Sequence, residues 1–133
     1  MTDHYKPASN VFANQADTLR TCVEVGKLLK EIGETITSNL SEQDILIKYG
    51  GDEYIIILPG RSKTQAVKHS KNILRAIKES TYLKSEAEPA RITASVGIAS
   101  YPEDAETKKE LLILADNALF KIKNSTKNSV GTA

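Results

Sequence analysis

This chain of 133 residues has one cysteine, two histidines and no long apolar run. The single cysteine, Cys22, excludes an intramolecular disulfide and a zinc site built from several thiolates. It falls within a helical apolar pattern, which favours a buried core residue over a nucleophile. No apolar run approaches the roughly 20 residues that a membrane-spanning helix needs, and the polar start lacks the apolar stretch of a signal peptide. These absences favour a protein of the cytoplasm.

An excess of charge of either sign is also missing. The 18 Lys and Arg residues nearly balance the 17 Asp and Glu residues, and the net charge is +1. Proteins that bind nucleic-acid polymers non-specifically usually carry a clear basic excess, so we expect no such partner. A single nucleotide needs only a few local cations, and the charge balance does not exclude it.

Apolar periodicity predicts where helices and strands lie. The length and the 40% share of hydrophobic residues suit a single domain over residues 1–133. Residues 1–14 show no periodicity and are expected to be mostly irregular. Apolar residues at spacings of three and four predict a helix over residues 15–37. Asp44–Tyr49 and Tyr54–Leu58 are β-rich runs, and the few residues between them predict an antiparallel hairpin.

Two capping-box patterns predict further helices. Ser62 with Gln65 begins one, and Thr107 with Glu110 begins the other. Between these helices, residues 91–101 alternate as a strand does. The predicted order is helix, hairpin, helix, strand, helix. The helices must bury their apolar stripes, and we expect them to cover one face of an antiparallel sheet in an α+β fold.

The hairpin tip combines two glycines with two carboxylates. Gly50 and Gly51 permit positive φ and the close approach of another group to the backbone. Asp52 and Glu53 supply oxygen ligands, and Mg²⁺ is commonly held by one or two carboxylates together with substrate phosphates. Such an ion polarises a phosphoryl oxygen and helps to activate an attacking hydroxyl. Gly-Gly-Asp is also ordinary turn chemistry, so these residues alone leave a purely structural role open.

The residues around the tip resemble one known family. The run Lys48–Pro59 is similar to the signature hairpin of the GGDEF domain, the diguanylate cyclase domain of bacterial signalling proteins. Ile92–Pro102 resembles the strand that follows in this family. Ala115–Lys123, with Lys127 and Asn128 shortly after, resembles its last helix. The resemblance covers about residues 3–130 in consistent order.

This resemblance implies a fold, a reaction and partners. The fold is a palm-like sheet related to those of nucleotidyl cyclases and polymerases. The reaction is the condensation of two GTP molecules into cyclic dimeric GMP, with release of pyrophosphate and with Mg²⁺ or Mn²⁺ as cofactor. Each subunit of an antiparallel homodimer would hold one GTP. A sensor domain, upstream or on a partner protein, is expected to regulate the reaction.

The resemblance also implies roles for individual residues. Asp52 would be a metal ligand, and Glu53 a metal or transition-state partner. The two glycines of the tip would let guanosine lie close to the backbone. Lys123 and Lys127 would neutralise phosphates, the second in place of the family's usual Arg. The alternative for both lysines is a solvated helix end, where cations suit the helix dipole.

The beginning of the chain departs from the family pattern. The family's first strand ends in Asp-x-Asp-x-Phe-Lys, and Thr2–Lys6 aligns with the end of it, which puts Met1 at the first Asp. Lys6 matches the Lys of that motif and is expected to contact the nucleotide. The family's opening helix and most of its first strand are missing, which would leave sheet edges unpaired. Either the chain is a fragment of a longer one, or it completes its sheet in another way.

Two further motifs are altered. In the family's guanine-contacting segment, this chain keeps Asn10 and Asp17, our candidates for reading guanine. Asp17 is explained equally well as an acid in the first turn of a helix. The product-binding motif Arg-x-x-Asp reads Ser41–Asp44 without its Arg, so feedback inhibition by that route is not expected. The chain is therefore an active diguanylate cyclase, a degenerate module that binds GTP or a partner without turnover, or a cyclase with another base preference.

Overall fold

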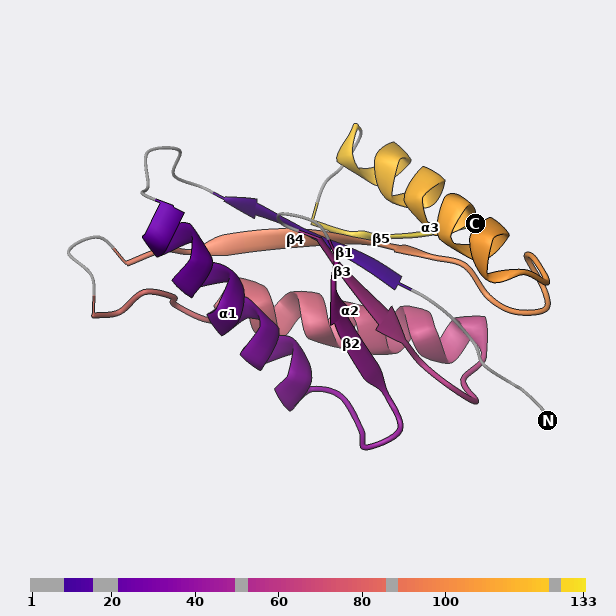
Figure 1. The fold of residues 1–133 in the computed structure, drawn as a ribbon, viewed down its shortest axis with the longest axis horizontal. Coiled ribbons are helices and arrows are strands. Elements are labelled where there is room, and N and C mark those ends of the chain that lie inside the picture. The colour runs from indigo at the N-terminus through magenta and orange to yellow at the C-terminus, as the bar shows by residue number, and fades with distance from the viewer. Residues whose placement is uncertain (1–8, 16–21, 50–52, 86–88, 125–127) are drawn as a thin grey trace.

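The computed structural model describes residues 9–15, 22–49, 53–85, 89–124 and 128–133. Within these residues the elements, in chain order, are β1 (Ser9–Gln15), α1 (Cys22–Ser38), β2 (Ile45–Lys48), β3 (Glu53–Ile57), α2 (Lys63–Glu79), β4 (Ile92–Ile98), α3 (Lys108–Lys123) and β5 (Val130–Thr132) (Figure 1). The strands form one sheet in the order β2-β3-β1-β4-β5. All pairs are antiparallel except β4 with β5. The predicted α+β class with an antiparallel sheet is confirmed.

The centre of the sheet is β1. Ser9 pairs with Ile56 of β3 on one side and with Ile98 of β4 on the other. The expectation of irregular structure is therefore wrong for residues 9–14, and Gln15 ends a strand instead of beginning a helix. The segment has no period-two pattern, and pairing on both edges places it. With β1 in this position the sheet is complete between β3 and β4.

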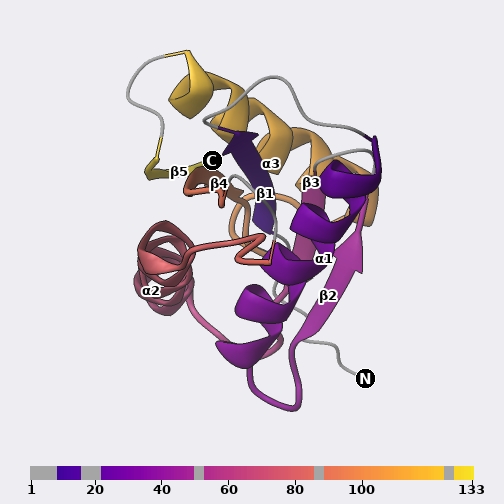
Figure 2. The same cartoon turned by 90° about the vertical axis from the view of Figure 1, so that its left-hand side faces the viewer.

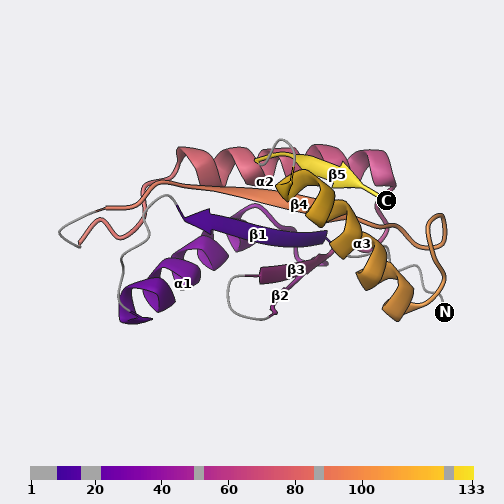
Figure 3. The same ribbon diagram turned by 90° about the horizontal axis from the view of Figure 1, so that it is seen from above.

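Helices lie on both faces of this sheet. Figures 2 and 3 show α1 and α2 on one side and α3 on the other. The expectation that the helices cover one face is therefore wrong for α3, because β4 has apolar or small residues on both faces and must be covered twice. The main core lies on the side of α1 and α2 and includes Leu28, Ile32, Ile36, Ile56, Leu58, Ile73, Ile77, Ile92, Val96 and Ile98. Within the described part of the chain, no helix is long and apolar enough to cross a membrane.

The two helix starts differ in detail. The Ser62 side chain accepts a hydrogen bond from the N–H of Gln65, and the Gln65 side chain accepts one from the N–H of Ser62, so α2 begins with the predicted capping box. At α3 the Thr107 hydroxyl accepts from the N–H of Glu110 (3.2 Å). The Glu110 carboxylate accepts from that hydroxyl (3.0 Å) and not from the Thr107 backbone, so the second box is only half formed.

The contact between α3 and β4 is made at Gly97. A Cβ at this position would lie 2.2 Å from the carbonyl oxygen of Ala115 and 2.5 Å from the amide nitrogen of Leu119. Both neighbours are backbone atoms of α3, so they cannot move aside as a flexible side chain would. The missing side chain therefore sets how closely the helix approaches the sheet.

We expect Gly97→Ala to destabilise the protein by about 3 kcal/mol, because the new methyl group forces α3 away from β4. Gly26→Ala is the matched control, since nothing lies within 4 Å of a Cβ there. In helix α1 that substitution should stabilise by up to about 1 kcal/mol. Urea unfolding of the two variants measures both effects. Equal stability of the Gly97→Ala variant and the parent would contradict the close packing.

Candidate functional site

The hairpin with the glycine and acid tip is formed by β2 and β3. The two strands pair antiparallel from Ile45 opposite Ile57 to Lys48 opposite Tyr54, which confirms the predicted hairpin. Beyond the last pair, the Tyr49 N–H donates to the Glu53 carbonyl at 2.8 Å. This bond closes the ladder immediately before the tip. Strand β3 therefore begins at Glu53, the acidic residue that follows the tip, at the end of the β2–β3 hairpin.

Tyr54 anchors the base of the tip to α1. Its side chain is buried, and its hydroxyl donates a hydrogen bond to the carbonyl of Leu29. The ring packs against Gly33, where an added Cβ would be in ordinary van der Waals contact, 3.4 Å from the hydroxyl oxygen. Burial raises the pKa of the Tyr54 hydroxyl. Because neighbouring residues of a strand point to opposite faces, Glu53 lies on the face of the sheet that carries α3.

The pairing register places Glu53 in one row with residues of two other strands. Phe12 of β1 pairs with Glu53 on one side and with Ser95 of β4 on the other. With strands roughly 4.8 Å apart, the backbones of Glu53 and Ser95 are separated by about 10 Å. The Ser95 hydroxyl accepts a hydrogen bond from the N–H of Asn128 at 3.0 Å. The connection between α3 and β5 therefore reaches the row of the sheet that contains the start of the tip.

The structure describes three of the nine residues predicted for the site. Glu53 is half-buried at the start of β3, and Lys123 is half-buried in the last turn of α3. Asn10 lies within the central strand, with its backbone paired to Ile55 and to Gly97. The others lie outside the described residues: Lys6, Asp17, Gly50, Gly51, Asp52 and Lys127. Among the residues that the structure does describe, no three His, Cys, Asp or Glu side chains gather as a metal site.

A further polar cluster lies at the other end of the hairpin, in the altered Ser41–Asp44 motif. Arg61 Nη1 donates to Asp44 Oδ1 at 2.7 Å, and Arg61 Nη2 donates to Asp44 Oδ2 at 3.1 Å. Nη2 also donates to the Ser41 hydroxyl oxygen at 2.9 Å. Sequence reasoning missed Arg61. The available signal was the hairpin register, which pairs Ile45 with Ile57 and so brings the residues just outside both strands together.

The Asp44 carboxylate is fully enclosed, whereas Arg61 is partly exposed. Burial by itself would raise the pKa of Asp44. Hydrogen bonds from Arg61 and Ser41, together with the charge of Arg61, outweigh burial and hold that pKa below its ordinary value. A carboxylate whose pKa is lower in the folded than in the unfolded state stabilises the folded state at pH values above its unfolded pKa. This contribution is lost as the pH falls through the folded pKa.

We therefore expect Asp44→Asn to lower the free energy of unfolding by about 2 kcal/mol at neutral pH, as for other hydrogen bonds to charged groups. The gap between the variant and the parent should shrink as the pH falls below 3.8, the ordinary value for this carboxyl. Urea unfolding across that range measures it, with Glu42→Gln as the control at an exposed carboxylate of the same loop. A gap that stays constant with pH would contradict the assignment.

Comparison with known proteins identifies a family that matches most of the chain. Residues 23–129 match the profile of the family described as "Diguanylate cyclase, GGDEF domain". The bifunctional diguanylate cyclase/cyclic di-GMP phosphodiesterase MucR of Pseudomonas aeruginosa is 37% identical over 101 residues, 76% of this chain and 14% of MucR. Diguanylate cyclase A of Treponema denticola is 29% identical over 103 residues, 77% of this chain and 28% of that protein.

Solved structures share the fold. The GGDEF domain of YfiN, also named TpbB, from Pseudomonas aeruginosa superposes with a TM-score of 0.87 at 24% identity, covering 98% of this chain and 83% of that one. An EAL/GGDEF domain protein from M. capsulatus gives a TM-score of 0.79 at 27% identity, covering 95% and 84%. The chain spans between 14% and 33% of the length of the curated relatives named above and of the Bacillus subtilis protein YhcK.

Proposed function

The chain belongs to the GGDEF domain family of diguanylate cyclases, and we propose that it condenses two GTP molecules into cyclic dimeric GMP. The family match spans the hairpin, and this is the observation on which the proposal rests. Each condensation joins a ribose hydroxyl of one GTP to the α-phosphate of the other and releases pyrophosphate. A homodimer would supply two nucleotides, one from each subunit. We place this activity in the cytoplasm, where GTP is present.

The residues at the hairpin end suit a divalent cation. Asp52 and Glu53 offer carboxylate oxygens, and Mg²⁺ takes oxygen ligands from few carboxylates and from substrate phosphates. Bound there, Mg²⁺ or Mn²⁺ would polarise the phosphoryl group and support an attacking hydroxyl. Because side chains alternate along a strand, Glu53 lies on the face of the sheet that carries α3, where Asn128 also contacts the sheet at Ser95. We infer that Gly50 and Gly51 admit the nucleoside, and that Lys6, Lys123 and Lys127 bind phosphates.

A second function is a degenerate module that binds GTP or a partner without turnover. The favouring observation is the altered segment of residues 10–17, where the chain keeps Asn10 and Asp17 but departs from the family's guanine-contacting pattern. The backbone of Asn10 lies within the central strand, opposite Gly97. Met1 also stands at the position of the family's first acidic residue.

Replacing Asp52 separates these functions. We expect the parent chain to form cyclic dimeric GMP from GTP with Mg²⁺ or Mn²⁺, and Asp52→Ala to reduce product by about 100-fold or more. Glu106→Ala removes an exposed carboxylate before α3 and should leave the rate unchanged. Mass spectrometry of the product at high protein concentration measures both. Unchanged product from Asp52→Ala would refute the metal assignment, and no product from a parent that binds GTP would establish the degenerate module.

The lysine at the end of α3 provides a narrower test. Because a charge-assisted hydrogen bond to phosphate is lost, Lys123→Ala should raise the Kd for GTP by about tenfold. Lys121→Ala removes a cation from the same last turn and is the matched control. Titration with a fluorescent GTP analogue measures both affinities. Equal effects of the two substitutions would assign Lys123 to the solvated helix end.

A further inference from the structure

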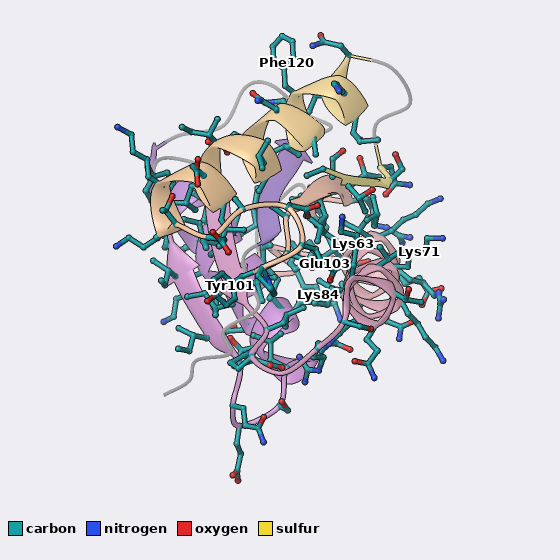
Figure 4. All side chains as sticks on the ribbon, turned by 90° about the vertical axis from the view of Figure 1, so that its right-hand side faces the viewer. Lys63, Lys71, Lys84, Tyr101, Glu103 and Phe120 are labelled. Carbon is teal, nitrogen blue, oxygen red and sulfur yellow. The ribbon has the colours of Figure 1, made fainter. Side chains whose placement is uncertain are left out.

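A row of basic side chains runs along the exposed face of α2. Lys68, Lys71, Arg75 and Lys78, here called the basic stripe, are all exposed. At 3.6 residues per turn, their spacings keep them within an arc of roughly 80° and over a length of about 15 Å. Figure 4 shows Lys71 on the outer side of α2, away from the sheet. The basic stripe is therefore one continuous surface of the helix.

No carboxylate of the described residues neutralises the basic stripe. Within the described part of the chain, none of its four side chains forms an ion pair. The only acidic residue of α2 is Glu79, at its last position. Like charges three and four residues apart lower the stability of a helix. Such an arrangement weakens α2 by itself, but it is well suited to an anionic ligand.

The C-terminal part of the basic stripe borders a hollow. Lys71, Arg75 and Lys78 line it on the α2 side, and residues 128–130 line it on the β5 side, with a volume of about 430 Å³. Leu74, which is buried, also lines it and gives the hollow an apolar floor between cationic and polar walls. Figures 2 and 3 show β5 beside α2 at this place.

The β5 side of the hollow is the edge of the sheet. The carbonyl of Ser129 accepts from the N–H of Val96 at 3.0 Å, and the N–H of Ala133 donates to the carbonyl of Ile98 at 2.8 Å. Because backbone groups alternate in direction along a strand, the N–H and C=O of residues 130 and 132 point out of the sheet. An extended chain could pair with these groups as an added strand.

We propose that the hollow between α2 and β5 binds an extended acidic segment of a partner protein. The backbone of the segment pairs with the outer edge of β5, as in other strand-addition complexes. Its carboxylates, at alternate positions about 6.8 Å apart, face the basic stripe, whose successive cations are about 5–6 Å apart on the helix surface. The basic stripe contains none of the nine residues assigned to the hairpin site.

The observations favour a peptide over the other polyanions. A net charge of +1 provides no general basic excess for a nucleic-acid polymer. The large hydrophobic side chains that are exposed in the described residues lie outside α2, at Ile45, Ile47, Tyr49, Ile113 and Phe120. The stripe therefore has no apolar side chain beside it to insert into a lipid surface. The open strand edge offers amide groups that only an extended chain can use.

A labelled peptide of alternating Glu and Thr tests the proposal by fluorescence anisotropy. We expect the double variant Lys71→Glu and Arg75→Glu to weaken its binding by about tenfold or more. The double variant Lys108→Glu and Lys109→Glu changes the net charge equally at an exposed site on α3 and should bind like the parent. Equal losses in both variants would overturn the proposal, and thermal unfolding checks that each variant folds.

Substitution of the strand edge tests the backbone pairing. Thr132→Pro removes an N–H that points away from β4, a change that an edge strand tolerates. It should raise the Kd for the peptide by about threefold or more, because one backbone hydrogen bond is lost. Unchanged binding would refute strand addition. An oligothymidine or a phosphatidylserine vesicle that binds more tightly than the peptide, and that also depends on Lys71 and Arg75, would refute a protein partner.

Discussion

The close contact between α3 and β4 is the constraint on which the rest of the structure depends. It exists because Gly97 has no side chain where the backbone of Ala115 and Leu119 passes. With α3 held against the sheet, Asn128, shortly before β5, donates its N–H to the Ser95 hydroxyl of β4. That bond lies in the same row of the sheet as the first residue of β3. The missing side chain of Gly97 thus sets how closely α3 approaches the strand that carries Ser95.

The hairpin is fixed from the opposite face. Tyr54 inserts its ring against Gly33 and binds the Leu29 carbonyl, so α1 holds the base of the tip while Glu53 faces the other way. A rigid scaffold on one face and an acidic residue on the other is a sound basis for a binding site, because the position of a functional group is then set by packed elements and not by the loop itself. This hairpin lies within the part of the chain that matches the GGDEF domain family.

Charged residues serve two different purposes in this chain. Asp44 is enclosed and paired with the partly exposed Arg61, and their pairing stabilises the outer end of the hairpin. The four cations of the basic stripe on α2 form no ion pair within the described residues and remain at the surface, whereas Lys63 at the start of that helix pairs with Asp104. A net charge near zero therefore hides an uneven distribution, because α2 is a basic helix whose only acidic residue is Glu79. Composition alone does not reveal this asymmetry, since it depends on which residues share a face.

The sequence by itself determined the hairpin and the three helices, because turn glycines, capping residues and apolar periodicity act over short distances. The family was identified by the resemblance of motifs such as Lys48–Pro59. The sequence also selected nine site residues by resemblance. Only the tertiary structure placed Ser9–Gln15 in the centre of the sheet and added Val130–Thr132 at its edge, since a strand without alternation and a strand of three residues are defined by their partners. The pairing of Arg61 with Asp44 and the burial of both faces of β4 were likewise decided by contacts between segments distant in the chain, and local patterns carry no record of such contacts.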